Sequence, residues 1–435
     1  MTASQQSIAT LDEIGGGADP LAAARDAESA QIAAREHVER SALHDTGDGR
    51  PAQVGLELEF HLVDLAAPDR RPGWAEVQAL VGQLPAMPSG STVTIEPGGQ
   101  LELSTPPAVG VAAAVAALRA DRTVLRRALA GVGYGTAALG TDPARPPARI
   151  NPAGRYAAME KHFAALGCAE PGRAMMTATA ALQVNLDAGP RGGWAHRLDG
   201  IRDLGPVLVA ASACSPLLGA RESGWASMRQ QSWLGIDPRR SGVVAGADPC
   251  AAWASYALDA PVMLLRDPRR PGGVTAVTAR VPFGAWVSGA HPFDRPPSLA
   301  DLDYHLTTLF PPVRPRGYVE IRYLDAVPDR WWPALAALTV TLVDDPVAAD
   351  RARELCEPLR GEWVRAARDG LRDPEIRAAA AGCADVAARR CPQPLRPEVD
   401  ALAELIARGR CPGDEVRERA AAAAPSTVLE EEARA

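Results

Sequence analysis

Hydrophobic and polar residues alternate in four short segments of the chain, and this alternation predicts four β-strands. In the segment 55–60, Glu57 and Glu59 share one face and three apolar side chains share the other, because successive side chains of a strand point to opposite faces. The pattern recurs at residues 95–104, 182–187 and 318–323. The polar faces of these three segments contain acids, amides, serine and arginine but no lysine: Gln100, Glu102, Ser104, Gln183, Asn185, Asp187, Glu320 and Arg322.

Helical patterns fill much of the remaining chain. Periodic apolar residues or alanine-rich runs predict helices at 20–43, 74–84, 109–130, 151–165, 194–218, 299–310 and over most of 330–424. Residues 174–187 are predicted to form one long strand. Long helices between strands, without a regular strand–helix–strand repeat, favour an α+β fold with an antiparallel sheet.

The same pattern divides the chain into four parts. We expect an N-terminal helical region at 1–50, a main domain with the four strands at 51–345, a C-terminal helical region at 346–424 and a disordered tail at 425–435. The tail is short, and it is dominated by alanine and glutamate.

The acidic faces suggest a cation site if the four strands converge. Neighbouring carboxylates raise one another's pKa and cannot all stay ionised without a cation. Hard divalent cations prefer oxygen ligands, and Mg²⁺ commonly combines carboxylates with substrate phosphates. The alternative is a set of solvent-facing edge strands. A single Glu-x-Glu strand would favour that alternative, whereas four such segments in one chain favour a face that holds Mg²⁺ and a nucleotide.

Composition excludes several classes of protein. The chain has 435 residues, is 47% hydrophobic and carries a formal net charge of −7, which argues against a nucleic-acid partner. Residues 1–17 do not have the pattern of a signal peptide, and the longest apolar stretch, 204–219, is too short to span a membrane. We therefore expect a cytoplasmic protein without a membrane partner. The seven cysteines form no Cys-x-x-Cys pair and are expected to be reduced thiols.

Basic residues restrict the chemistry further. Lys161 is the only lysine, and because His162 follows it, the chain has no Gly-Lys-Ser/Thr phosphate-binding loop. Any bound phosphate must therefore be held by arginine and metal.

Three segments of the sequence resemble the plant-type glutamate–cysteine ligases. They are EPGGQLELS at 96–104, MMT at 175–177 followed by LQVNLD at 182–187, and MRQQSW at 228–233 followed by RRSG at 239–242. They occur in the order that the family has. Within the family, the resemblance is greatest to the bacterial branch that serves ergothioneine biosynthesis. It extends from about Val54 to Asp325, so 51–345 is identified as the catalytic ligase domain.

The resemblance implies both a fold and a reaction. The fold would be a curved antiparallel sheet like that of glutamine synthetase, with a carboxylate-lined face and helices around it. ATP, the co-substrate, would phosphorylate the γ-carboxylate of L-glutamate, and the amine of L-cysteine would then displace phosphate. Two or three Mg²⁺ ions would be the cofactors. The expected partners are these small molecules, while the oligomeric state stays open.

The resemblance also assigns residues. The metal-binding side chains would be Glu57, Glu59, Glu96, Glu102, Glu320 and Gln183, the last at a position where other branches have histidine. Arg322 matches an arginine beside the transferred phosphate, and it and Glu320 are assigned to catalysis. The residues expected to bind glutamate or ATP are Arg229, Trp233, Arg240, Asn185 and Gln100.

Alternatives stay open at this level. Arg229 taken alone is equally well explained as a helix-surface arginine, and Asn185 as a residue that hydrogen-bonds within the sheet. The same scaffold could serve a ligase with another amine acceptor, because the sequence does not identify the acceptor pocket. A non-catalytic metal- or nucleotide-binding relative is a third possibility, and retention of the acids and Arg322 argues against it.

Overall fold

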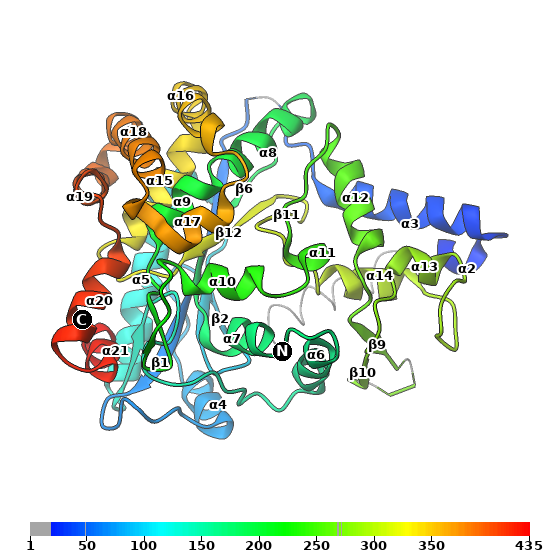
Figure 1. The fold of residues 1–435 in the computed structure, drawn as a ribbon, viewed down its shortest axis with the longest axis horizontal. Coiled ribbons are helices and arrows are strands. Elements are labelled where there is room, and N and C mark those ends of the chain that lie inside the picture. Colours follow the sequence, from blue (N-terminus) through cyan, green and yellow to red (C-terminus); the bar gives the residue numbers. More distant parts are fainter. Residues whose placement is uncertain (1–18, 48, 268, 271) are drawn as a thin grey trace.

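An eight-stranded antiparallel sheet forms the centre of the molecule (Figure 1). The computed structural model describes residues 19–435 except 48, 268 and 271. Six strands follow one another in the order β11-β12-β6-β1-β3-β2, and β4 and β5 also pair with β1. The strands are β1 (Gln53–Asp64), β2 (Thr92–Ile95), β3 (Leu101–Ser104), β4 (Ala108–Val109), β5 (Tyr134–Ala137), β6 (Ala181–Leu186), β11 (Val313–Pro315) and β12 (Val319–Asp325).

The apolar face of the sheet is closed by helices. Leu56, Leu58 and Phe60 of β1 have no exposed surface. The helices in contact with the sheet are α5 (Gly110–Ala130) on β1, α9 (Gly205–Ser212) on β12 and α15 (Trp332–Asp344) on β6. Most of α15 is buried, so its sequence is apolar on all sides.

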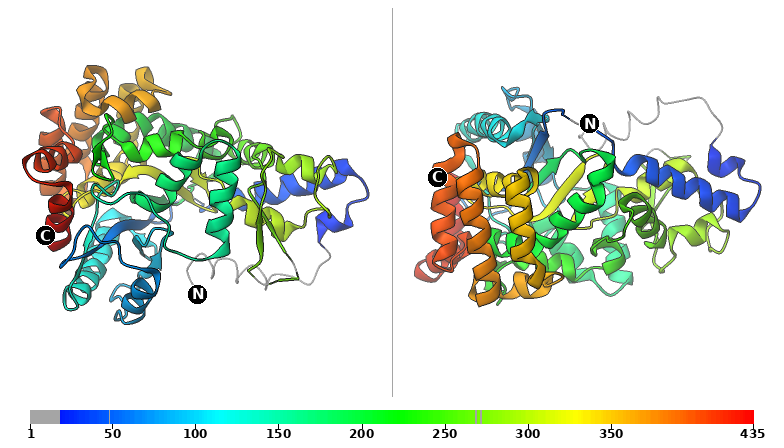
Figure 2. Two further views of the ribbon diagram at one scale, coloured as in Figure 1. Left: turned by 60° about the horizontal axis from the view of Figure 1, so that its bottom comes forward. Right: turned by 90° about the horizontal axis from the view of Figure 1, so that it is seen from above.

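The C-terminal helices lie together at one end of the molecule, drawn in orange and red in Figures 1 and 2. They are α16 (Pro346–Cys356), α17 (Trp363–Asp369), α18 (Pro374–Arg390), α19 (Arg396–Ala407), α20 (Pro412–Ala422) and α21 (Pro425–Arg434), with short 3₁₀ turns at Glu357–Leu359, Gly370–Arg372 and Gln393–Leu395. The helical pattern predicted for 330–424 is confirmed.

The N-terminal helices project at the opposite end (Figure 2). The helix predicted over 20–43 is present in two pieces, α2 (Pro20–Ala23) and α3 (Ala27–Ala42), each with an aspartate side chain as its N-cap. Helix α3 contacts α12 (Pro249–Asp259), α13 (Phe283–Val287) and α14 (Leu299–Leu306). The part of the predicted N-terminal region before residue 19 lies outside the described residues.

The remaining elements of the described chain are shorter helices and two hairpins. The helices are α4 (Trp74–Gly82), α6 (Gly154–Ala165), α7 (Ala169–Ala178), α8 (Trp194–Asp203), α10 (Met228–Leu234) and α11 (Pro238–Ser241), with a 3₁₀ turn at Arg191–Gly193. Two hairpins are formed by β7 (Leu217–Leu218) with β8 (Arg221–Glu222), and by β9 (Leu264–Arg266) with β10 (Val274–Ala276). Among the described residues, no helix combines the length and the apolar composition that a membrane span requires.

The long strand predicted at 174–187 is wrong in its first half. Residues 169–178 form α7, and β6 begins only at Ala181. The side chains of Ala174, Met175 and Met176 are all buried, so this part of α7 has no polar stripe. A short continuous apolar run does not distinguish a buried helix from a buried strand.

The prediction of a disordered tail at 425–435 is also wrong. Residues 425–434 form α21, in which Val428 and Leu429 have no exposed surface. Arg434 donates from Nη2 to the carbonyl of Leu65 at 2.9 Å, which ties the helix to the end of β1. The apolar stripe is narrow and lies among glutamates, so composition alone conceals it.

Helix α21 should therefore contribute to stability. We expect Leu429→Ala to lower the free energy of unfolding by about 2–5 kcal/mol, because it deletes a fully buried side chain. The matched control is Glu431→Ala at an exposed position of the same helix, which should change it by less than about 1 kcal/mol, the range of an exposed ion pair. Urea denaturation measures both values. Equal stability of the two variants would mean that α21 is not docked in solution.

Candidate active site on the polar face of the sheet

Strand pairing places the predicted acids side by side. Glu59 on β1 is opposite Glu102 on β3, and Glu102 is opposite Thr94 on β2. Glu57 is opposite Ser104 in the same pair of strands. Because the strand period is two, all five side chains lie on one face, opposite the apolar core.

The face continues across β6 and β12. Glu57 is also opposite Gln183 on β6, and Asn185 is opposite Glu320 on β12. Arg322 follows on β12 and donates from Nη1 to the Oε1 atom of Gln183 at 2.6 Å. The four predicted strand segments thus converge on one surface, as the sequence pattern predicts.

Hydrogen bonds orient three of the acids. Glu102 accepts from the hydroxyl of Ser104 at 2.9 Å and from that of Thr94 at 3.2 Å. Glu57 accepts from the Asn185 amide at 2.9 Å. The Glu59 carboxylate accepts from the backbone N–H of Ala181 at 2.7 Å. Asn185 therefore orients an acid of this face, and its side-chain oxygen is buried without a partner among the described residues.

Burial and mutual repulsion raise the pKa of these carboxyls. Burial raises the pKa of Glu57 to about 8, and Glu102 and Glu320 add to the effect. Burial, followed by the charge of Glu59, raises the pKa of Glu102 to about 7. The pKa of Glu59 is also raised, chiefly by burial. Near neutral pH this face therefore retains protons that a bound cation would displace.

Glu96 reaches the same cluster from a tight turn. Burial raises the pKa of Glu96 well above its usual value, and Glu102 and Glu59 raise it further. The turn requires glycine twice. A Cβ atom on Gly98 would lie 2.1 Å from the Thr177 carbonyl oxygen, and Gly99 has a φ of +88°. The EPGG sequence therefore brings a further carboxylate, that of Glu96, to the polar face of the sheet.

Glu320 is held differently from the other acids. Its carboxylate accepts from Arg314 Nε at 2.6 Å and Nη2 at 2.9 Å, and from Arg322 Nη1 at 3.0 Å. These arginines overcome the effect of burial and hold the pKa of Glu320 far below its usual range. Both oxygens are therefore engaged by guanidinium groups. The arrangement fits an anchor for Arg322 better than the metal ligand expected from the sequence.

Arg229 and Trp233 face this region from helix α10. Both Arg229 and Arg322 have their guanidinium carbons 5.9 Å from the centre of the Trp233 ring. Arg229 is 2% exposed, so it is not the helix-surface arginine that the sequence left open. Its charge acts on Glu59, whose pKa it lowers against the larger effect of burial.

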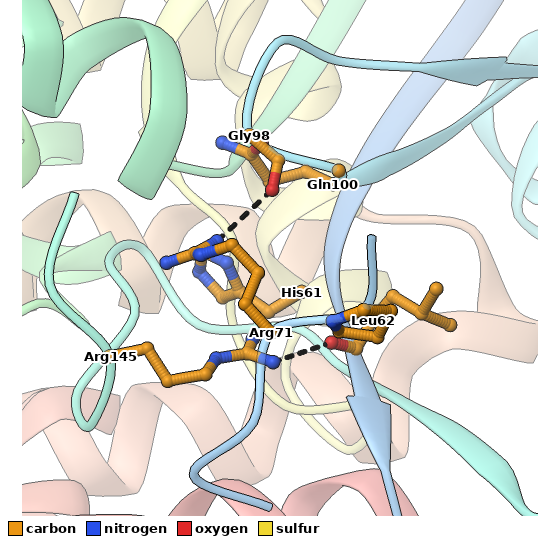
Figure 3. A pocket seen from close by; sticks show the side chains of 8 residues that line it. His61, Leu62, Arg71, Gly98, Gln100 and Arg145 are labelled. Atoms are coloured by element: carbon orange, nitrogen blue, oxygen red, sulfur yellow. Dashed lines mark hydrogen bonds between the residues drawn. The ribbon is translucent and has the colours of Figure 1, made fainter. Parts of the chain in front are cut away.

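Two predicted substrate ligands are not brought to this face. Arg240 has no exposed surface and donates to the Thr308 carbonyl at 2.7 Å and to that of Pro261. Arg240 therefore braces the loop before β11, and its assignment to glutamate or ATP binding stays a prediction. Gln100 donates to the Thr179 carbonyl at 2.9 Å and lines a separate small pocket (Figure 3).

Sequence reasoning missed several residues beside the acids. Arg314 and Arg316 alternate along the segment that enters β12, a spacing that could have signalled them; Arg316 lies 3.7 Å from Glu320. Burial and then the charge of Glu320 raise the pKa of Tyr318 to about 12. Tyr156 of α6 lies near Glu96, which with burial raises the pKa of its phenol. No local sequence pattern distinguishes Tyr156 from the other residues of its helix.

The donor set is suitable for a hard cation, although it does not form a closed cage. Within the described part of the chain, no three His, Cys, Asp or Glu side chains surround one point closely enough to hold a metal ion. The carboxylates line a surface, and Mg²⁺ typically uses one or two protein carboxylates together with water and substrate phosphates. Burial is the main cause of the raised pKa values of Glu57 and Glu102, and neighbouring carboxylates raise them further by more than the charge of Arg322 lowers them.

Comparison with known proteins identifies the relatives of this chain. The family model described as glutamate-cysteine ligase family 2 (GCS2) matches residues 53–434. The glutamate–cysteine ligase EgtA of Mycolicibacterium smegmatis is 49% identical over 402 residues, which are 92% of this chain and 93% of the relative. That of Mycobacterium tuberculosis is 51% identical over 376 residues, 86% of this chain and 87% of the relative.

More distant matches support the fold. The chloroplastic glutamate–cysteine ligase of Arabidopsis thaliana is 29% identical over 290 residues, 65% of this chain and 54% of the relative. The crystal structure of a glutamate–cysteine ligase from Francisella tularensis, in complex with AMP, superposes with a TM-score of 0.56 at 13% identity, covering 89% of this chain and 88% of that one. These matches confirm the predicted resemblance and the predicted α+β fold.

The raised carboxyl pKa values predict how pH affects stability and cation binding. Between about 4.5 and about 8, the native state holds protons that the unfolded chain has released, so the cation-free protein should become less stable as pH rises through this range. A divalent cation must displace those protons, so its affinity should increase over the same range. Calorimetric melting at pH 5 to 8, with and without Mg²⁺, measures both trends.

The variant Glu102→Gln tests whether the crowded carboxylates cause these trends in stability and cation affinity. At pH 8 without cation it should melt roughly 2 °C or more above the parent, because one repelling charge is gone. It should also lose most of the Mg²⁺-induced rise. Glu354→Gln, at an exposed position on α16, is the matched control and should behave as the parent. A Glu102 variant that keeps the full Mg²⁺ response would remove this residue from the cation site.

Proposed function

The chain belongs to the glutamate–cysteine ligase family 2, and we propose that it uses ATP to join the γ-carboxylate of L-glutamate to the amine of L-cysteine. The product is γ-glutamylcysteine, which we assign to ergothioneine biosynthesis on the resemblance to that bacterial branch. The observation that carries the proposal is the shared face on which Glu57, Glu59 and Glu102 meet Arg322. A crowded carboxylate face beside a fixed arginine suits phosphoryl transfer.

The proposed site has a cation side and an anion side. Glu57, Glu59, Glu96 and Glu102 would hold Mg²⁺, which supplies neutralisation of phosphate charge when it is bound. Arg322 is fixed between Glu320 and Gln183, so its guanidinium can stabilise the transferring phosphoryl group without reorganising. Arg229 and Trp233 would contact the anionic substrates from α10.

The reaction proceeds in two displacements. A γ-carboxylate oxygen of glutamate attacks the γ-phosphorus of ATP, and ADP leaves with the electrons of the broken P–O bond. The amine of cysteine then attacks the acyl carbon, and phosphate leaves with one of the original carboxylate oxygens. The amine loses a proton in this step and the thiol takes no part. The protein's role is to position the reactants and to balance the charge.

Arg322→Lys should impair the first displacement despite keeping the positive charge. A planar guanidinium hydrogen-bonded to Glu320 and Gln183 has a fixed direction, which a flexible ammonium does not reproduce. We expect kcat to fall by about 10²-fold or more, as for loss of one preorganised transition-state donor. Steady-state ADP release measures it. The matched control, Arg122→Lys, alters a buried arginine that pairs with Asp329, and it should lower stability while kcat is retained. Near-normal kcat in the Arg322 variant would make this arginine a structural residue.

Isotope transfer tests the acyl phosphate directly. Glutamate labelled with ¹⁸O in its γ-carboxylate should pass one labelled oxygen to inorganic phosphate when ATP, Mg²⁺ and cysteine are all present. Mass spectrometry of phosphate and AMP separates the outcomes. Label in AMP would mean adenylation and would overturn the proposal. Label in phosphate, with another amine preferred over cysteine, would keep the chemistry and change the acceptor.

A further inference from the structure

Arg229 is a buried cation with unused donors. Its Nη2 donates to the carbonyl of Arg322 at 2.8 Å, while Nε and Nη1 are buried and have no hydrogen-bond partner among the described residues. Leaving charged N–H groups buried and unpaired is costly, so such groups indicate a position kept ready for an anion. The charge of Glu59 acts on Arg229 from the polar face of the sheet.

Asp325 lies behind Arg229, at the end of β12. One of its oxygens is 4.0 Å from Arg229 Nη1, close enough for charge attraction but too far for a hydrogen bond. Asp325 is 1% exposed. The carboxylate therefore stabilises the positive charge of Arg229 and leaves its N–H groups free.

The Asp325 carboxylate also accepts hydrogen bonds from two other segments of the chain. It accepts from the hydroxyls of Ser215 at 2.6 Å and Ser227 at 2.8 Å, and from the backbone N–H of Cys214 at 2.9 Å. The Ser215 oxygen in turn accepts from the backbone N–H of Arg229 at 3.1 Å. Asp325 thus fixes the main chain of Arg229 as well as its charge.

These bonds also begin the helix that carries Arg229. Ser227 is the N-cap of α10, and its hydroxyl oxygen accepts from the backbone N–H of Gln230 at 3.1 Å. The Gln230 side chain donates to the carbonyl of Tyr323 at 2.8 Å. The first turn of α10 is therefore attached to the strand that carries Arg322 and Asp325.

The enclosure around Asp325 is tight. A Cβ atom on Gly140 would lie 2.6 Å from the Asp325 Oδ2 atom, so only glycine fits there without displacing the carboxylate. The position of Asp325 is consequently set by packing as well as by hydrogen bonds.

We propose that Asp325 is a positioning residue for the ligase reaction, which holds Arg229 so that its free N–H groups receive an anionic group of a substrate. This inference rests on the proposed function. The anion is a carboxylate of glutamate or a phosphate of ATP, since both present oxygen pairs to a guanidinium. Separate KM values for the two substrates distinguish these sources.

The variant Asp325→Asn keeps the shape of the side chain and removes its charge. KM for one of the two anionic substrates should rise about tenfold or more, as for loss of a hydrogen bond to a charged group, while KM for the other changes much less. The matched control is Asp121→Asn, which removes another fully buried carboxylate, one that accepts from the backbone of Ser89 and Ser91. It should lower stability without raising either KM selectively.

A double-mutant cycle separates positioning from general support of the fold. If Asp325 acts through Arg229, then Asp325→Asn should have almost no further effect on that KM once Arg229→Ala is present. Additive effects would overturn the proposal. Gly140→Ala, which crowds the carboxylate but keeps its charge, should raise the same KM.

Two further measurements apply if the Asp325 variant does not fold or if the parent protein is inactive. If Asp325→Asn does not fold, Ser215→Ala removes one hydrogen bond of the network and should raise the same KM several-fold, comparable to loss of a single neutral hydrogen bond; an unchanged KM would count against the proposal. If the parent protein releases no ADP with glutamate and cysteine, the proposed function fails. Calorimetric binding of glutamate and of ATP to the parent and the variant then tests the positioning role by itself.

Discussion

Crowding of carboxylates in a half-buried face is the constraint on which this structure depends. Glu59 and Glu102 are direct partners in the β1–β3 register, and Glu57 is one step along the same face. Burial raises the pKa of all three carboxyls, and a neighbouring carboxylate raises each of them further. A protein that maximised its own stability would not keep such a face. The free-energy cost of crowding these carboxylates is consistent with a site that is stabilised only when cations and substrates are bound.

The arginines of the site divide into engaged and available groups. Arg314 directs two N–H groups to Glu320 and thereby saturates that carboxylate. Arg322 shares Glu320 and also bonds Gln183, so its direction is fixed. Arg229 has only one of its side-chain hydrogen bonds satisfied within the described part of the chain. The fold therefore fixes one arginine beside the acids and leaves two nitrogens of another without a hydrogen-bond partner among the described residues.

Features that depend on local interactions could be predicted from the sequence, whereas features that depend on contacts between distant segments could not. The polar face was predictable because strand alternation is local, and the 55–60 and 182–187 segments carry it within six residues each. The saturation of Glu320 was not, because it depends on Arg314 across a strand pair. Burial of Arg240 likewise depends on carbonyls of distant loops. Helix α7 is missed because its buried run at 174–178 has no exposed polar positions that would set a helical period, and α21 is missed because glutamates surround its apolar stripe of Val428, Leu429 and Ala433, so that composition conceals it.

Charge balance explains why both kinds of group must occur in one site. ATP and glutamate are anions, and the face formed by Glu57, Glu59 and Glu102 would repel them if it were ionised and bare. A protonated face would repel less, but it could not hold a divalent cation, since the ligands must be ionised. Cation and nucleotide are therefore expected to bind with mutual support. Arg229, on α10, is attracted by both Asp325 and Glu59, and two of its side-chain nitrogens have no hydrogen-bond partner among the described residues. On the proposed function, Arg229 would receive an anion on one side of the site, while the acids on the other side would exchange protons for a cation.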